Sequence, residues 1–167
     1  MEISIKSFIL FGSVIFTGLS AGLFYAWSVS VIPGTQKVAD ATYLETMQSI
    51  NQAILNPAFY LIFFGSLIFL SISSVYEFHN SKVTFWLLLA SSIIYLIGTV
   101  GVTALGNVPL NDQLELLELT ELSAKKLAEF RTFYETNWNR LHLIRTIFAV
   151  VSFLLSVLGV FSHSRIF

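Results

Sequence analysis

The stretch WNRLHLIRT (residues 138–146) runs directly into IFAVVSFLLSVLGVF (residues 147–161), and this junction decides the fold. The second piece carries no charged residue, whereas the first holds an Asn, a His and two Arg. Charged groups are costly inside a bilayer and are found there mainly where they face a protein interior. The junction therefore predicts a membrane-spanning helix over about 141–161 whose polar side chains turn inward.

The composition indicates that lipid is the solvent for much of the chain. Hydrophobic residues make up 55% of the 167 residues and charged residues 11%, whereas ordinary soluble domains are about a quarter charged. The net charge is −1, so no basic surface large enough to bind nucleic acid is expected. The chain has no cysteine, which excludes disulfides, thiolate nucleophiles, Cys-ligated zinc, iron–sulfur clusters and thiolate-bound haem.

Four apolar stretches have the length of about 20 residues that a membrane span needs. They cover residues 7–32, 57–76, 83–105 and 141–161. We therefore expect an all-α fold, a single domain over residues 1–167, forming a four-transmembrane-helix bundle. The first stretch is about twice the length of a signal-peptide core, so we expect it to be retained. The expected location is a multi-pass position in the bacterial inner membrane.

The connections carry helix signals of their own. Apolar residues at helical spacing within residues 33–56 predict a short helix at the membrane interface after Pro33 and Gly34 end the first span. Asn56 precedes a proline and is a natural N-cap of the second span. Pro109 predicts a turn after the third span, and a helical extension with a break near Ser123 precedes the fourth.

The last helix has one polar stripe. At 100° per residue, a sector of about 120° collects its polar and small side chains, and the opposite side is aliphatic. The stripe comprises Arg131, Glu135, Trp138, Asn139, His142, Arg145, Thr146, Ala149 and Ser156. It is expected to face the bundle interior. In the first span, Gly18 and Gly22 stand four residues apart, a spacing that lets helix backbones approach closely.

Most of the asparagines fall at one end of the predicted bundle. Asn51, Asn56, Asn107, Asn111, Asn137 and Asn139 all lie on the side of the two long connections. His142 and Arg145 are at the same end, above an apolar interior, where a small-molecule site would form. Structural roles stay open beside this one: caps for Asn56 and Asn111, a turn residue for Asn107, and an anchor at the interface for Arg145.

Four motifs resemble those of the anthrone oxygenase-like family of small membrane proteins. They are FYAWSVSVIPG (24–34), QSINQAILNP (48–57), GNVPLN (106–111) and WNRLHLIRT (138–146). The resemblance implies a fold of four helices and, for the named members, oxygenation of an anthrone to an anthraquinone. In many relatives the Asn and His of the last motif are adjacent. Here Asn139 and His142 are separated by almost one helical turn.

An oxygenase with these residues is expected to work without a cofactor, since no dinucleotide fingerprint is present and the three histidines are not expected to converge on an iron. Haem on His142 is the alternative. In the cofactor-free route His142 is the base, and Arg145 stabilises negative charge. Asn139, Asn107 or Asn111 orients the base or donates to the oxyanion. The predicted substrate-binding residues are Asn51, Asn56, Asn107, Asn111, Tyr25 and Trp27.

Two classes without catalysis remain open. The protein can bind a small hydrophobic molecule or a membrane lipid without transforming it. It can also assemble with other membrane proteins, or with copies of itself as a homo-oligomer, through the small residues of the first span. In that case Gly18→Leu is expected to disrupt the complex, and His142→Ala is expected to leave it intact.

Overall fold

The computed structural model describes residues 5–164, which are almost entirely helical, with no strand in that range. The predicted all-α fold is confirmed. The α-helices are α1 (Ile5–Ala26), α2 (Ile32–Thr35), α3 (Asp40–Ala53), α4 (Pro57–Glu77), α5 (Lys82–Ile94), α6 (Val108–Glu115) and α7 (Ala124–Ser164). Three π-helical segments, η1 (Trp27–Val31), η2 (Tyr95–Gly101) and η3 (Thr103–Asn107), and a 3-10 turn, η4 (Leu119–Glu121), complete the order.

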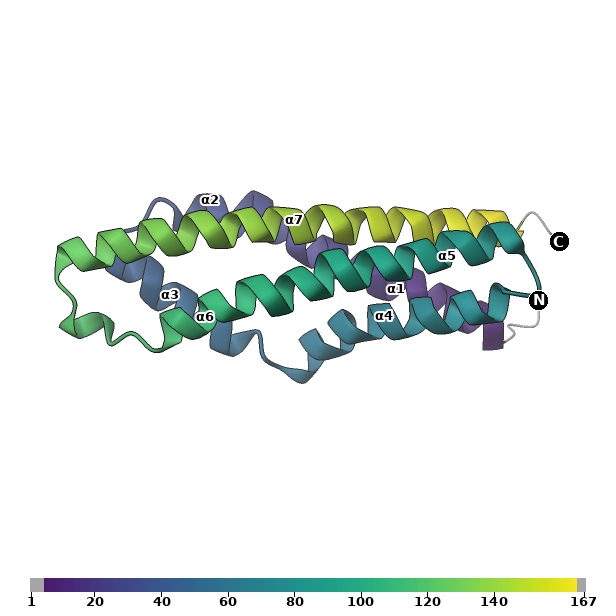
Figure 1. Cartoon of the computed structure of the whole chain (residues 1–167), viewed down its shortest axis with the longest axis horizontal. Helices are drawn as coiled ribbons and strands as arrows, with labels where there is room; N and C mark the ends of the chain where they lie inside the picture. The colour runs from purple at the N-terminus through teal and green to yellow at the C-terminus, as the bar shows by residue number, and fades with distance from the viewer. Residues whose placement is uncertain (1–4, 165–167) are drawn as a thin grey trace.

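Four of these helical stretches are long and apolar enough to cross a membrane: Ile5–Thr35, Pro57–Glu77, Lys82–Glu115 and Ala124–His163. They form a ring in which α1 packs on α4 and α7, and α5 packs on the same two helices. In Figure 1 the start of α1 and the end of α7 lie at one end of the bundle. The helices α3 and α6 lie at the other end, which we call the polar end.

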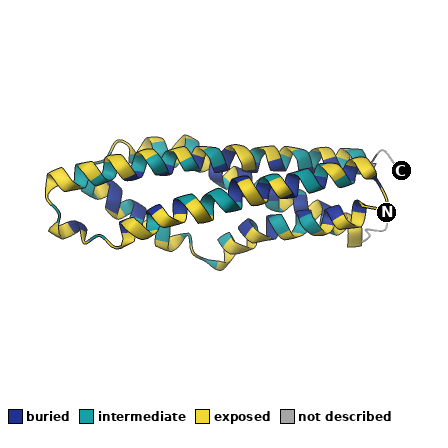
Figure 2. Cartoon of the chain, in the orientation of Figure 1, coloured by how far each residue is buried: buried dark blue, intermediate teal, exposed yellow. Residues whose placement is uncertain are grey.

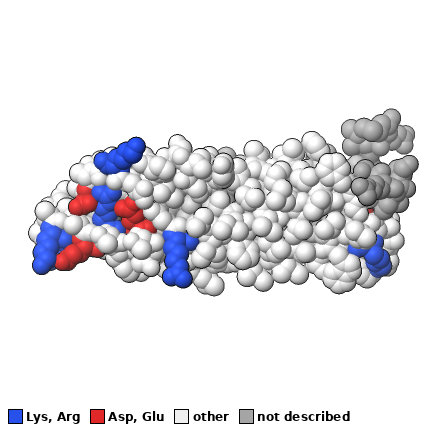
Figure 3. Space-filling model, turned by 90° about the horizontal axis from the view of Figure 1, so that it is seen from above, with Lys and Arg blue, Asp and Glu red and all other residues white. Residues whose placement is uncertain are grey.

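The surface of the bundle is that of a multi-pass membrane protein. Buried residues follow the inner faces of the long helices, and exposed residues follow the outer faces (Figure 2). Lys, Arg, Asp and Glu gather toward the two ends, with a long uncharged stretch between them (Figure 3). Large apolar side chains cover that stretch, as expected where lipid is the solvent. Examples are Phe11 (64% exposed), Ile97 (64%) and Leu154 (53%).

The interior of the membrane part is partly polar. Hydrogen bonds between side-chain hydroxyl groups join neighbouring helices. The pairs are Ser13 with Ser73 (2.7 Å), Thr17 with Ser156 (3.1 Å) and Ser91 with Ser152 (2.8 Å). The predicted stripe of α7 is confirmed, because Trp138, His142 and Arg145 are buried, whereas Leu143 and Ile147 are more than half exposed. Small hydroxyl side chains let helices approach closely and satisfy one another without water.

The two prolines expected near the ends of spans lie inside helices, Pro33 close to the end of the first span and Pro109 well before the end of the third. Pro33 lies in α2 and Pro109 in α6, each directly after a π-helical segment within one continuous helix. Proline lacks an N–H and crowds the carbonyl four residues earlier, which here belongs to Val29 or Leu105. Both carbonyls fall inside the π-helical segments, whose wider turns make room for the ring. The predicted turn at Pro109 is therefore wrong, whereas the first span ends at Thr35, directly after the predicted end at Pro33 and Gly34.

The expectation for the glycines of the first span is wrong in part. A Cβ placed on Gly22 would have no neighbour within 4 Å, so no helix approaches there. A Cβ on Gly18 would lie 3.1 Å from the Phe153 ring, so this glycine does face α7. The tightest position is Gly98 in η2, where the ring of Phe148 occupies the space of a side chain.

Candidate functional site

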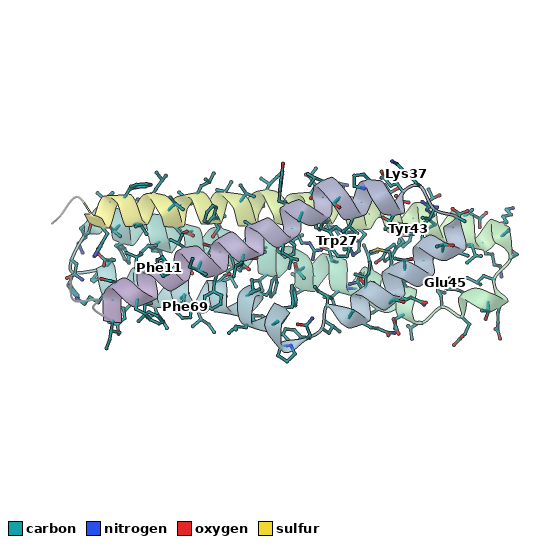
Figure 4. The ribbon with its side chains drawn as sticks, turned by 180° about the vertical axis from the view of Figure 1, so that it is seen from behind. Phe11, Trp27, Lys37, Tyr43, Glu45 and Phe69 are labelled. Atoms are coloured by element: carbon teal, nitrogen blue, oxygen red, sulfur yellow. The ribbon has the colours of Figure 1, made fainter. Side chains whose placement is uncertain are left out.

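The polar end encloses a cavity of about 350 Å³ between the long helices. The structure brings six of the predicted site residues to its wall: Asn51, Asn107, Asn111, Trp27, His142 and Arg145. These residues come from α3, η3, α6, η1 and α7, which are distant in sequence. Figure 4 shows Trp27 about midway along the bundle, with Lys37, Tyr43 and Glu45 farther toward the polar end.

Three predicted residues lie outside the cavity wall. Asn56 is the N-cap of α4: its side chain accepts from the N–H of Phe59 at 3.0 Å, which is the capping role that the sequence left open. Tyr25 is 58% exposed on the outer face of α1. Asn139 is half-buried on α7 but does not reach the cavity.

Both ring nitrogens of His142 have partners. Nδ1 lies 3.2 Å from Nε and 3.0 Å from Nη2 of Arg145, and because a guanidinium has only donors, Nδ1 must accept. The proton of the neutral ring is therefore on Nε2, which lies 3.1 Å from the carbonyl oxygen of Phe24 and 3.0 Å from Oγ of Ser28. The side chain is 1% exposed, so protein atoms on both sides fix its orientation.

Arg145 is a buried cation without a carboxylate. It is 8% exposed, and within residues 5–164 none of the ion pairs includes it. Its remaining hydrogen bond runs from Nη1 to the hydroxyl of Thr103 at 3.3 Å. The rings of Phe24 and Trp138 lie 4.7 and 5.1 Å from its Cζ and stabilise the charge through their faces. We call His142 and Arg145 together the polar head of the cavity.

Trp138 supports the polar head through its ring, and we call it the platform. The sequence analysis placed this residue only within the polar stripe of the last helix. Its ring stacks on His142 with centroids 5.0 Å apart and planes 6° apart. Its Nε1–H donates to Oδ1 of Asn111 at 2.9 Å, and the hydroxyl of Tyr134 donates to the same oxygen at 3.0 Å. Nδ2 of Asn51 in turn donates to the Tyr134 hydroxyl at 3.2 Å. This chain of bonds fixes the imidazole through its stacking partner.

Sequence reasoning missed Tyr134 as part of this network. It is fully buried and joins α3, α6 and α7. The available sign was its place on the helix, four residues before Trp138 on the same face. The two asparagines it joins, Asn51 and Asn111, therefore support the platform as well as lining the cavity.

Asn107 brings an unused acceptor to the site. It is 1% exposed, and its Nδ2 donates to the carbonyl oxygen of Trp138 at 3.3 Å. Its Oδ1 is buried and has no hydrogen-bond partner in the described part of the chain. A buried acceptor without a donor costs about 1–3 kcal/mol. A ligand that offers an O–H group would remove that cost after a small side-chain movement.

The rest of the wall is aromatic and aliphatic. Phe24, Phe59 and Phe63 surround the inner part, with Phe59 and Phe63 stacked at 5.2 Å. In the described range no three His, Cys, Asp or Glu side chains lie close enough together to hold a metal ion. The wall therefore offers flat apolar faces to a ring system and concentrates its polar chemistry at the polar head.

One comparison assigns the chain to a family. The family model for anthrone oxygenase matches residues 55–155. The chain belongs to the anthrone oxygenase family. The match covers more than half of the sequence and includes Asn107, Asn111, Trp138 and the polar head, so the resemblance expected from the motifs is confirmed. No curated protein and no solved structure matches the chain.

Proposed function

We propose that this member of the anthrone oxygenase family oxygenates a flat, phenolic carbon acid of the anthrone type in the cavity at the polar end. The observation that carries the proposal is Arg145, a buried guanidinium with no carboxylate partner among residues 5–164. A buried charge without a partner is unfavourable. An oxygen anion formed on the ligand would supply the missing partner at the place where the charge develops.

The geometry supports a specific sequence of steps. A guanidinium has five N–H donors, and Arg145 uses three of them on His142 and Thr103, so two remain for a ligand oxygen. As Arg145 turns toward that oxygen, Nδ1 of His142 loses its donors and its lone pair becomes available. His142 then takes a proton from the CH₂ carbon of the ligand, and the electron pair moves onto the ligand oxygen beside Arg145.

The remaining chemistry balances without a further reductant. Dioxygen joins the deprotonated carbon, and His142 returns its proton to give a hydroperoxide. Loss of water, with the second hydrogen of the same carbon, leaves a carbonyl group. In total CH₂ and O₂ become C=O and H₂O, so the ligand carbon is oxidised by dioxygen itself. Trp27, Trp138 and the phenylalanines of the wall fit a flat ring system.

The first experiment compares two histidines. Purified protein is mixed with a hydroxylated anthrone, and oxygen uptake and quinone absorbance are followed. His142→Ala is expected to lower the rate by about 10²-fold or more, whereas His79→Ala, an exposed histidine outside the cavity wall, is expected to leave it unchanged. If His142→Ala reacts as fast as the parent protein, the base assignment is wrong. A Soret band in the purified protein would replace this route with haem chemistry.

A second function is favoured by one observation: in this arrangement both nitrogens of His142 are occupied. A site whose base stays occupied binds its ligand without transforming it. The same experiment separates the two functions. Quenching of the cavity tryptophans by the anthrone without oxygen uptake would identify a binding protein, and oxygen uptake that requires the protein identifies an enzyme.

A further inference from the structure

We infer that the cavity is filled sideways from the bilayer, through an apolar mouth between α4 and α6, and that its ligand arrives as a neutral, lipid-dissolved weak acid. The chemical identity of that acid rests on the proposed function, whereas the route rests on the cavity alone. Three observations carry the inference: an exposed apolar rim, a closed water-facing side, and a cation that lies only at the inner end.

The rim of the mouth is apolar and faces outward. Four residues of the cavity wall are also exposed on the outer surface: Leu55 (61%), Tyr60 (41%), Phe64 (45%) and Val108 (41%). Tyr60 and Phe64 lie one turn apart on the first part of α4, with their rings stacked at 6.1 Å. Leu55 precedes α4, and Val108 begins α6. Leu55 lies just before the second span, Tyr60 at its start and Val108 toward the end of the third, so acyl chains or their interfacial ends are expected to contact them.

On the water-facing side of the cavity, buried residues of α3, α6 and α7 form a packed cluster, and hydrogen bonds join α3 to α6 and to Leu117 after it. Nε2 of Gln48 donates to the carbonyl oxygens of Leu114 and Leu117 at 2.9 and 3.2 Å. One turn along α3, Nε2 of Gln52 donates to Oε1 of Glu115 at 2.6 Å. We call these bonds the roof. Behind them Leu44, Met47 and Leu114 are buried at 0–2% exposure, so access from water requires this packed layer to open.

The charge distribution then selects the ligand. Any ligand that passes the rim must leave water for apolar surroundings, which is strongly unfavourable for a formal charge. At the inner end it meets Arg145, which favours the anion. The site therefore takes compounds that are neutral in the bilayer and lose a proton inside. Permanently anionic, water-soluble relatives of the same ring system are excluded at the mouth.

A ligand-free measurement tests the route first. The chain has three tryptophans, of which Trp27 and Trp138 line the cavity and Trp86 is 63% exposed on α5. Trp86→Phe leaves fluorescence only at the cavity. In vesicles, phospholipids brominated along the acyl chains are expected to quench this fluorescence, and aqueous acrylamide is expected to have little effect. The reverse pattern, strong acrylamide quenching and none from bromolipid, would overturn the inference whatever the protein's activity.

A blocking experiment then locates the mouth. Because the chain lacks cysteine, single variants can be modified cleanly in the Trp86→Phe background. Tyr60→Cys places the thiol at the rim, Gln52→Cys at the roof, and Ile68→Cys two turns farther along α4, where Ile68 is 53% exposed. A bulky maleimide is attached to each, and the binding rate of a neutral hydroxyanthraquinone is followed by tryptophan quenching.

Modification at the rim is expected to slow binding by about tenfold or more, relative to the same variant unmodified. Modification at Ile68→Cys or Gln52→Cys is expected to leave the rate unchanged. Slowing at the roof with none at the rim would overturn the route. If Tyr60→Cys does not fold, Val108→Cys tests the opposite side of the rim. Absence of any ligand quenching in the unmodified protein contradicts the proposed function, and the bromolipid measurement then decides the route by itself.

Discussion

Two arginines on α7, the partly buried Arg131 and the buried Arg145, have opposite surroundings. Arg131 lies near the start of the helix, and its side chain is 12% exposed. Arg145 lies farther along the same helix and is 8% exposed. Both guanidinium groups lie close to an aromatic ring. They differ in whether a carboxylate pairs with the guanidinium. We use that difference to distinguish an arginine that stabilises the fold from one that is available to a ligand.

Arg131 is fully compensated. Its Nη1 and Nε contact the carboxylates of Asp40 (2.9 Å) and Glu135 (3.0 Å). Its Nη1 and Nη2 also donate to the carbonyl oxygens of Val38 (2.6 Å) and Gln36 (3.1 Å). The ring of Tyr43 lies 4.6 Å from its Cζ, and burial, together with the charge of Glu135, raises the pKa of Tyr43 so that the phenol stays neutral. Arg131 thus ties the connection before α3 to α7.

No carboxylate among residues 5–164 pairs with Arg145. Its partners are the neutral groups of His142 and Thr103 and the faces of two aromatic rings. Burying a charge in this state lowers the stability of the fold, and a stable ion pair like that of Arg131 would avoid the cost. A position that keeps such a charge at the wall of a cavity is expected to use it on a ligand.

The largest effect is expected from Arg145→Met. The substitution removes the donors for the ligand anion, so turnover of a hydroxylated anthrone is expected to fall by about 10²–10³-fold. Stability against denaturant in detergent is expected to change by less than about 1 kcal/mol or to rise, because an uncompensated buried charge is replaced by an apolar side chain of similar length. Full activity in this variant would end the distinction between the two arginines.

The second largest effect is expected from Arg131→Met, with the opposite profile. Two carboxylates and the backbone carbonyls around residues 36–38 lose their donor, so the free energy of unfolding is expected to fall by about 3 kcal/mol. Turnover per folded molecule is expected to remain near that of the parent protein. The measurement is an unfolding curve beside an activity assay on the same sample. A stable but inactive Arg131→Met would place this arginine in the site and contradict the comparison.

Part of this contrast was visible in the sequence. A helical wheel placed Arg131, His142 and Arg145 of the last helix on one inward stripe. The wheel also placed Arg131 one turn from Glu135, and the two side chains form an ion pair, at 12% and 17% exposure. Periodicity predicts which face is inward, because polar side chains that faced lipid would be costly.

The helical pattern could not predict which residues of an inward face line the cavity. A stripe of about 120° contains both Trp138, which reaches the cavity, and Asn139, which does not. Tyr25 and Trp27 are about 200° apart on a helix, so one of them had to point away, and their sequence positions do not say which. The turn predicted at Pro109 is wrong because a π-helical segment precedes this proline within one continuous helix, and such segments have no periodic sequence pattern.

Thr103→Asp sharpens the comparison by making Arg145 resemble Arg131. The Thr103 hydroxyl lies 3.3 Å from Nη1 of Arg145, so a carboxylate there is expected to pair with the guanidinium and replace the ligand anion. Binding and turnover of the anthrone are expected to fall by about tenfold or more, while the folded state persists. Thr103→Asn, of the same size and uncharged, is the control and is expected to retain most activity. Equal loss in both variants would show that shape, not charge, decides.

The smallest effect is expected from Asp40→Asn, which removes one of the two carboxylates of Arg131. Asp40 is 42% exposed, so solvent already screens its attraction, and the free energy of unfolding is expected to fall by only about 0.5–1 kcal/mol. That loss should shrink further as salt is added, since the Debye length is about 8 Å at physiological ionic strength. Activity is expected to be unchanged at every salt concentration, because the compensated arginine takes no part in binding. A salt-dependent change in turnover on Asp40→Asn would mean that the field of this cluster reaches the polar head, and the two arginines would then have to be treated as one electrostatic unit.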